Sequence, residues 1–146
     1  MAKTAFISTY TFKIDRKGRV SVPADFRAVM TAKGEDGLDV LPLSGVKAVR
    51  AIGADLLSKI GQSADPLAAF KPSSLDHAAI LAADLVALQI DSEGRVGLPE
   101  AVIAHCGLAE TATFAGRIQF FEIWNPEAFA ADQAEKRRAI LGGGPG

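Results

Sequence analysis

The sequence predicts an α+β fold in which two β-β-α-β-β-α repeats share one compact, β-barrel-like core with pseudo-twofold symmetry. The stretch KIDRKGRVSVPADFR, residues 13–27, returns in part as QIDSEGRVGLPEAVI, residues 89–103, at an offset of 76 residues. Each copy is followed by two more strand-like runs and a helix-like run. Half of a 146-residue chain supplies few strands, and an open sheet that small would leave its edges unpaired. The two halves are therefore expected to share a core.

The first copy opens with two short strands. Residues 9–14 alternate between polar and apolar side chains, as a half-buried strand does, with Tyr10, Phe12 and Ile14 on the apolar face. Val20 and Val22 supply the apolar face of the second strand, which leaves Arg19 on its exposed side. If these strands pair with each other, the connection needs five residues or a bulge at Gly18, whereas pairing with other strands removes that constraint.

A short helix is expected to follow Pro23, because the missing N–H of proline is unpaired in a first helical turn anyway. Its apolar face would consist of Phe26, Val29 and Met30. The first copy then continues with strand-like residues 38–52 and a helix-like run at 53–60.

The second copy repeats this plan. Val86, Leu88 and Ile90 match the first apolar strand face, Val96 and Leu98 match the second, and Pro99 matches Pro23. In the helix that follows, core positions are expected for Val102, His105 and Cys106, and Gly107 would cap its C-terminus.

The chain after this helix is expected to form two strands, in residues 112–124, and a helix. The run IQFFEIW, residues 118–124, is interpreted as core and interface because aromatic residues are enriched at both. Asn125 and Pro126 form a good N-cap and N1 pair for the last helix.

The resulting division of the chain is a first repeat at 1–62, a connecting helical segment at 63–84, a second repeat at 85–141 and a flexible tail at 142–146. In the connecting segment, Ser73 and Asp76 resemble a capping box, which predicts a helix over 75–83.

Composition excludes several classes of protein. With 49% hydrophobic and 23% charged residues, the chain has the composition of an ordinary globular domain. No run approaches the roughly 20 apolar residues that a membrane span needs. We therefore expect no membrane partner, and we expect the protein to lie in the cytoplasm. The single cysteine, Cys106, forbids an internal disulfide, and with two histidines it cannot complete a zinc site, so no metal is expected.

The net charge of −1 conceals a strong asymmetry between the copies. Residues 1–33 contain seven basic and two acidic side chains, whereas residues 80–110 contain one basic and five acidic ones. A basic surface near the N-terminus is the electrostatic footprint that nucleic acid requires.

Within that basic region, the turn DRKGR is the candidate DNA contact. The Arg19 side chain suits bidentate contact with guanine or phosphate, and Lys17 suits a phosphate point charge. Gly18 allows a sharp turn, and Asp15 could accept hydrogen bonds from turn amides or orient Arg19. The competing interpretation is a surface turn with a modest salt bridge.

The corresponding turn DSEGR in the second copy is interpreted differently. Asp91 and Gly94 are expected to form the turn, and Arg95, which is flanked by acidic residues, is expected to make a subunit contact or an internal brace. The cations Lys136, Arg137 and Arg138 are most simply a solvated helix end, with DNA or subunit contact as the alternative.

The doubled DRKGR and DSEGR turns, each followed by Val-x-(Val/Leu)-Pro and a short helix, together with RIQFFEIWNPEAF, resemble the MraZ family of bacterial transcriptional regulators. The resemblance covers residues 6–141. More distantly, KGRVSVPADFR is similar to the AbrB and MazE group, which implies an AbrB-like double-split barrel. The chain departs from the family pattern at Ser8, where a glycine is usual, and in VRAIGADLL, where an aromatic-Pro element is common.

The resemblance implies a sequence-specific DNA-binding regulator that assembles into a ring-shaped homo-oligomer, with no cofactor and no small-molecule substrate. It would bind double-stranded DNA at short repeated boxes in the promoter of the division and cell-wall gene cluster, and so lie in the cytoplasm with the nucleoid. The family's DNA-contacting turn corresponds to Asp15, Lys17, Gly18 and Arg19. The full candidate set for DNA is Arg19, Lys17, Arg16, Lys13 and Arg27.

Two other functional classes compete with this one. A non-enzymatic structural or protein-interaction module, an antitoxin-like barrel with incidental DNA binding, would depend on its helices rather than on Arg19. An enzyme is the weakest alternative, because the sequence has no paired carboxylates on an apolar helix, no nucleophile elbow and no metal-spaced ligands.

Overall fold

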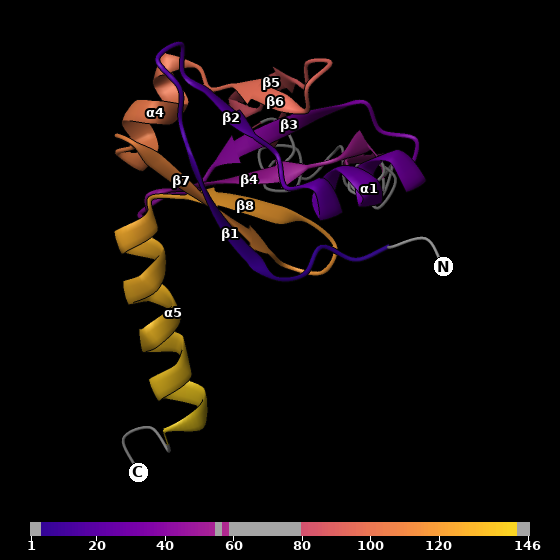
Figure 1. Cartoon of the computed structure of the whole chain (residues 1–146). Coiled ribbons are helices and arrows are strands. Elements are labelled where there is room, and N and C mark those ends of the chain that lie inside the picture. Colours follow the sequence, from indigo (N-terminus) through magenta and orange to yellow (C-terminus); the bar gives the residue numbers. More distant parts are fainter. Residues whose placement is uncertain (1–3, 55–56, 59–79, 143–146) are drawn as a thin grey trace, which may run out of the picture.

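The computed structural model describes residues 4–54, 57–58 and 80–142 and has a mixed α+β architecture (Figure 1). The first half of the chain contributes β1 (Thr9–Lys13), β2 (Arg19–Ser21), α1 (Ala24–Ala32), β3 (Gly37–Pro42) and β4 (Ala48–Ile52). The second half contributes β5 (Val86–Gln89), β6 (Arg95–Gly97), α4 (Glu100–Cys106), β7 (Thr111–Gly116), β8 (Phe121–Trp124) and α5 (Pro126–Leu141). The α+β class is confirmed.

The strands form a six-stranded antiparallel sheet in the order β1-β7-β8-β4-β3-β5 and a two-stranded ribbon of β2 and β6. Four of the pairings join the two halves of the chain, namely β1 with β7, β4 with β8, β3 with β5 and β2 with β6. One hydrophobic cluster contains buried residues from both halves, for example Val20 and Val96. Neither half therefore buries its own apolar face alone.

Strand β1 shows the predicted alternation, since Tyr10 and Phe12 are half-buried and the other three residues of the strand are exposed. Its partner is β7, with Thr9 opposite Ala115, and β2 is paired to β6 with Val20 opposite Val96. Of the two pairing schemes open from the sequence, the structure has the one in which β1 and β2 pair with other strands. No bulge at Gly18 is needed.

The first helix, α1, follows Pro23, which occupies the N-cap, and Phe26, Val29 and Met30 are buried as predicted. In α4 the predicted core positions Val102 and Cys106 are buried, and Gly107 ends the helix in the left-handed conformation with φ of 59°.

The predicted core position of His105 is wrong. Its ring is only half-buried, and its Nε2 lies 2.9 Å from the carbonyl oxygen of Leu43. The imidazole stays at the rim of the core because it needs a hydrogen-bond partner there.

The centre of the core is aromatic. Phe26 packs against Phe6 and Phe121 with ring centroids 5.5 Å and 5.0 Å away, and Phe114 lies 6.1 Å from Phe121. Of these rings, Phe26 and Phe6 come from the first half and the other two from the second. These contacts join α1 directly to β8 and, through Phe121, to β7.

The run 118–124 is only partly core. Phe121, Glu122, Ile123 and Trp124 are buried, but Ile118 is 66% exposed. Ile118 lies in the connection between β7 and β8 and has a φ of 71°. Ile118 is therefore not part of the core, and its place at an interface stays a prediction.

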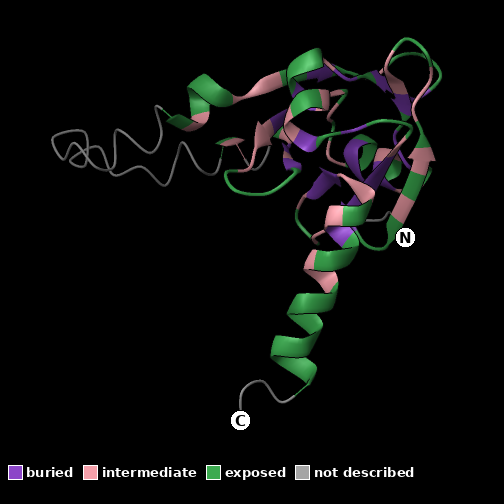
Figure 2. Cartoon of the chain, turned by 90° about the vertical axis from the view of Figure 1, so that its left-hand side faces the viewer, coloured by how far each residue is buried: buried purple, intermediate pink, exposed green. Residues whose placement is uncertain are grey.

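Helix α5 begins as predicted, because the Asn125 side chain accepts a hydrogen bond from the Ala128 N–H and Pro126 occupies the first turn. Phe129 is its one buried residue. The helix then projects away from the body, and its distal turns are exposed (Figure 2).

Of the two departures from the family pattern, VRAIGADLL begins in β4 and extends into residues outside the described part of the chain, and Ser8 is fully described. Ser8 adopts a φ of 76°, a conformation that glycine adopts readily, immediately before β1. The capping box at Ser73 and Asp76 lies outside the described residues, and residues 80–84 are helical. No helix in the described part of the chain has the length and apolarity to cross a bilayer.

Candidate nucleic-acid interface

The first turn, which we define as Asp15–Arg19, is closed by its own backbone. The Asp15 N–H donates to the Arg19 carbonyl at 2.8 Å, and the Gly18 N–H donates to the Asp15 carbonyl at 3.0 Å. Gly18 has a φ of 78°, in the left-handed region where a side chain is strained. The conformation of the turn therefore favours glycine at this position.

The Asp15 carboxylate holds the turn together. Its Oδ1 accepts from the Lys17 and Arg19 backbone N–H groups at 2.9 and 2.8 Å, and its Oδ2 accepts from Arg19 Nε at 2.7 Å. These contacts, first of all the Arg19 backbone N–H, lower the pKa of Asp15. Both roles proposed for Asp15 from the sequence are present together, since it accepts from turn amides and orients the Arg19 guanidinium.

Other cations lie in this turn and in the strand that leads into it. Lys13, Arg16 and Lys17 are exposed, and the Arg19 side chain keeps 34% of its accessible surface. Within the described part of the chain, Arg19 is bonded to Asp15 through Nε. Because Nε donates to Asp15 Oδ2, a bidentate contact of Arg19 with an external acceptor would use Nη1 and Nη2.

The second turn, Asp91–Arg95, has the same skeleton. Asp91 Oδ1 accepts from the Glu93 and Arg95 backbone N–H groups at 2.9 Å each, and Oδ2 accepts from Arg95 Nε at 3.1 Å. The backbone N–H of Arg95 is the chief cause of the lowered pKa of Asp91. The Gly94 φ of 80° matches that of Gly18.

The two turns differ in charge. In the second turn Arg95 Nη2 also lies 3.1 Å from Glu93 Oε2, so that the Arg95 guanidinium forms ion pairs with both Asp91 and Glu93. Residues 13–19 carry four cations and one carboxylate, whereas residues 89–95 carry one cation and two carboxylates. The first of these segments therefore has a net charge of +3 and the second a net charge of −1.

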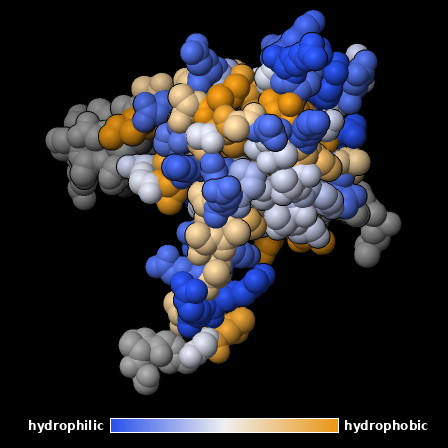
Figure 3. Space-filling view, turned by 60° about the vertical axis from the view of Figure 1, so that its left-hand side comes forward, coloured by the Kyte–Doolittle hydropathy of each residue, from blue (hydrophilic) through white to orange (hydrophobic). Residues whose placement is uncertain are grey.

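Both turns lie at the end of the molecule opposite to α5, where β1 runs into β2 and β5 runs into β6 (Figure 1). The space-filling view shows strongly hydrophilic surface at that end (Figure 3). The cations near the end of α5 lie far from the turns. Lys136 there lies 2.8 Å from Asp132, in an ion pair along the helix.

Arg27, the fifth candidate cation, occupies a different environment. Its Nε donates to the Val22 carbonyl at 3.2 Å, and its guanidinium lies against Gly94 of the second turn. The structure thus brings four of the five candidate cations to the first turn and its approach, and sets the fifth beside the second turn.

Sequence reasoning missed a buried ionic network. The Glu122 side chain is 3% exposed and accepts from Arg50 Nε at 2.9 Å, Arg117 Nε at 3.0 Å and Trp124 Nε1 at 3.0 Å. Burial alone would raise the pKa of Glu122, but the hydrogen bonds from Trp124, Arg117 and Arg50 outweigh it and hold the pKa below its usual range. The signal in the sequence is a lone carboxylate inside the apolar run FFEIW.

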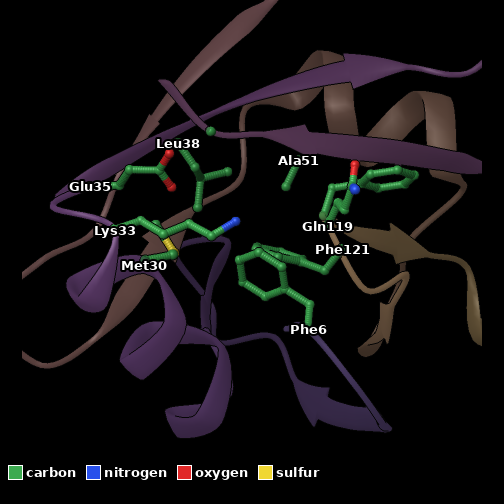
Figure 4. Close-up of a pocket in the computed structure, with 10 residues that line it drawn as sticks. Phe6, Met30, Lys33, Glu35, Leu38, Ala51, Gln119 and Phe121 are labelled. Carbon is green, nitrogen blue, oxygen red and sulfur yellow. The ribbon is translucent and has the colours of Figure 1, made fainter. Parts of the chain in front are cut away.

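Hollows of several sizes lie among the described residues. The most enclosed one, lined by Phe6, Lys33, Glu35 and Phe121 among others, has a volume of about 20 Å³, room for about one water molecule (Figure 4). Lys33 Nζ lies 5.5 Å from the centre of the Phe6 ring, which it faces across this space. Among the described residues, no group of histidine, cysteine and carboxylate side chains is arranged to bind a metal ion.

The sequence is similar to one family of known proteins. Residues 81–140 match the family model described as "MraZ protein, putative antitoxin-like". Proteins named Transcriptional regulator MraZ are similar over most of the chain. The one from Rhodospirillum rubrum is 38% identical over 97% of this chain and 92% of its own length. Those from Azorhizobium caulinodans and Pelagibacter ubique are 37% and 35% identical, over 97% and 91% of this chain and 94% and 86% of their own lengths.

Proposed function

This chain belongs to the MraZ family, and from that membership we propose that it is a DNA-binding transcriptional regulator whose first turn grips the double helix. The observation that carries the proposal is the charge contrast between two turns of equal geometry. Asp15 and Asp91 make the same set of hydrogen bonds, but Lys17 stands where the second turn has Glu93.

In this proposal the residues of the first turn have separate roles. Arg19, oriented by Asp15, reads a guanine edge or grips a phosphate through the outer edge of its guanidinium. Lys13, Arg16 and Lys17 contact phosphates as exposed point charges. Arg27 is assigned a supporting role, because its guanidinium is directed at Val22 and Gly94.

The architecture proposed for this function is an AbrB-like double-split barrel built from two repeats, at 1–62 and 85–141. The strand pairing supports it. The ribbon is centred on Val20 opposite Val96, two equivalent positions, and β1 with β7 corresponds to β5 with β3. A pseudo-twofold axis through the ribbon would relate the two turns.

Assembly into a ring-shaped homo-oligomer would give the turn its affinity. One turn offers few phosphate contacts, and such contacts alone bind weakly and in a salt-sensitive way. Several copies in one ring could bind several short repeated boxes at once. Binding would then be tight, because one bound turn raises the effective concentration of the other turns at the neighbouring boxes. The exposed apolar side chains of Ile140 and Leu141, each 78% exposed at the end of α5, support a role for that helix in assembly.

The proposed target is the promoter of the division and cell-wall gene cluster, including the chain's own gene, and the proposed location is the cytoplasm in association with the nucleoid. The test is a gel shift with the DNA upstream of that gene at two salt concentrations. Arg19→Ala, at unchanged oligomeric size, should weaken binding by about 5- to 150-fold, the loss of one bidentate base contact. Lys17→Ala should reduce the salt slope by about 0.9.

Arg95→Ala is the matched control, because Arg95 occupies the same position in the second turn and is matched by two carboxylates. It should bind DNA within about 2-fold of the native chain. Equal binding by the native chain and Arg19→Ala would remove the role assigned to the first turn.

The family description "antitoxin-like" favours one second candidate, a protein-interaction module. Its distinguishing outcome is a regulatory effect that survives Arg19→Ala and Lys17→Ala but is lost when the distal residues of α5 are changed. That result would replace the DNA-binding proposal.

A further inference from the structure

Each turn is hydrogen-bonded to the opposite half of the chain. The Gly18 carbonyl accepts from the Leu98 N–H at 2.8 Å, and the Gly94 carbonyl accepts from the Val22 N–H at 2.9 Å. Leu98 and Gly94 lie 76 residues after Val22 and Gly18, so the two contacts are equivalent. The first turn therefore rests on the segment that leads from β6 into α4.

A helix residue stands behind each turn glycine, and here the two halves differ. A Cβ on Gly18 would lie 3.6 Å from Ile103 Cδ1, in α4. A Cβ on Gly94 would lie 2.7 Å from the guanidinium carbon of Arg27, in α1. Arg27 and Ile103 are each the fourth residue of their helix, again 76 positions apart.

The difference between Arg27 and Ile103 corresponds to the difference in charge between the two turns. Arg27 lines the same surface hollow as Asp91, so its cation lies near the acidic second turn. A cation at position 103 would instead lie behind Lys17 and Arg19 and repel them. The isoleucine gives the basic turn an apolar support that does not compete with its cations.

We propose that Ile103 is a positioning residue for DNA binding, which holds the first turn against the second half so that Arg19 is presented in one orientation. The proposal rests on the DNA-binding function proposed above. The bonds of Asp15 fix the internal shape of the turn, while Leu98 and Ile103 fix where that turn lies on the body. Recognition of base edges requires both, because a contact group displaced by a fraction of an ångström loses its partner.

The substitution Ile103→Val tests this directly, because it deletes the Cδ1 methyl that lies nearest to Gly18. It should weaken DNA binding about 3-fold, and Ile103→Ala about 10-fold. The slope of binding against salt should stay at the native value, because every phosphate-contacting cation remains. A control is Ile90→Ala, which removes another half-buried isoleucine, next to the second turn.

A second measurement, made without DNA, keeps the inference independent of the proposed function. Amide hydrogen exchange at Leu98, whose N–H donates to the Gly18 carbonyl and so joins the first turn to the second half, should be faster in Ile103→Ala and unchanged in Ile90→Ala. Thermal unfolding of both variants checks that the fold as a whole is retained.

The possible outcomes separate the two proposals. Native exchange at Leu98 together with native affinity in folded Ile103→Ala would overturn the role of Ile103 and leave the function intact. A native chain that binds no DNA would overturn the proposed function, while faster exchange in Ile103→Ala would still support the mechanical link. A reduced salt slope in Ile103→Ala would contradict a positioning role, since it would mean lost phosphate contacts.

Discussion

The Glu122→Gln variant should be about 3 to 5 kcal/mol less stable than the native chain, because it replaces the buried carboxylate that accepts from the partly exposed Arg50 and Arg117 with a neutral amide. Glu122 takes hydrogen bonds from Arg50, Arg117 and Trp124 at 2.9 to 3.0 Å, and its side chain is 3% exposed. A glutamine amide can satisfy the donors on one side only, and its own NH2 group opposes the donors on the other. Two hydrogen bonds to charged groups, each contributing about 1.5 to 3 kcal/mol, account for the same range.

The assay is thermal unfolding followed by circular dichroism at equal protomer concentration. For a chain of 146 residues the entropy of unfolding is about 0.3 kcal/mol/K, so the expected loss lowers the melting temperature by about 10 to 15 °C. Glu93→Gln is the control, since the Glu93 side chain is 69% exposed and its contact with Arg95 should contribute less than about 1 kcal/mol. A melting temperature within about 2 °C of native for Glu122→Gln would refute the network as a stabilising element.

Three further outcomes are expected. The Asp15 carboxyl should titrate below 3.8 in an NMR pH series, and the stabilisation it gives the turn should be present above that pH and lost as the pH falls through the folded value; a midpoint at or above 3.8 would contradict this. Native Cys106 should react with a thiol reagent at pH 8 far more slowly than the unfolded chain does, because burial raises its pKa to about 11; equal rates would show that the thiol is accessible. Asn125→Ala should cost about 1 kcal/mol in a urea titration through loss of the α5 N-cap, and an unchanged midpoint would show that the cap contributes nothing.

Local features of the fold were accessible from the sequence because they depend on neighbouring residues. The alternation around Tyr10 and Phe12, the start of α1 after Pro23 and the cap at Asn125 each follow from a few adjacent side chains and backbone rules. The internal bonding of the first turn was also foreseen, because Asp15 and Arg19 lie only four residues apart.

Contacts between residues that are distant in the sequence could not be predicted in the same way. The sequence left open whether β1 pairs with β2, since strand periodicity shows which face is buried and not which strand lies beside it. Glu122 meets Arg50 across 72 positions, and no local pattern joins them. Arg27 was grouped with the other cations by charge, but its helix directs it toward Gly94 of the opposite half.

The exposure of Ile118 shows a different limit of prediction from the sequence. A run of apolar and aromatic residues predicts burial, but the connection between β7 and β8 falls inside that run and turns Ile118 outward with a positive φ. The turn is determined by the pairing of β7 with β8, in which Gly116 lies opposite Phe121. Residue type alone does not reveal where such a hairpin ends.

Photo-crosslinking tests most directly which turn meets DNA. A photoreactive amino acid is placed at position 17 in one variant and at position 93 in another, two equivalent and exposed sites in the first and second turns. On irradiation with the upstream DNA, position 17 should crosslink to the duplex and position 93 should not. Crosslinks from position 93, or from neither position under conditions where DNA is bound, would contradict the account.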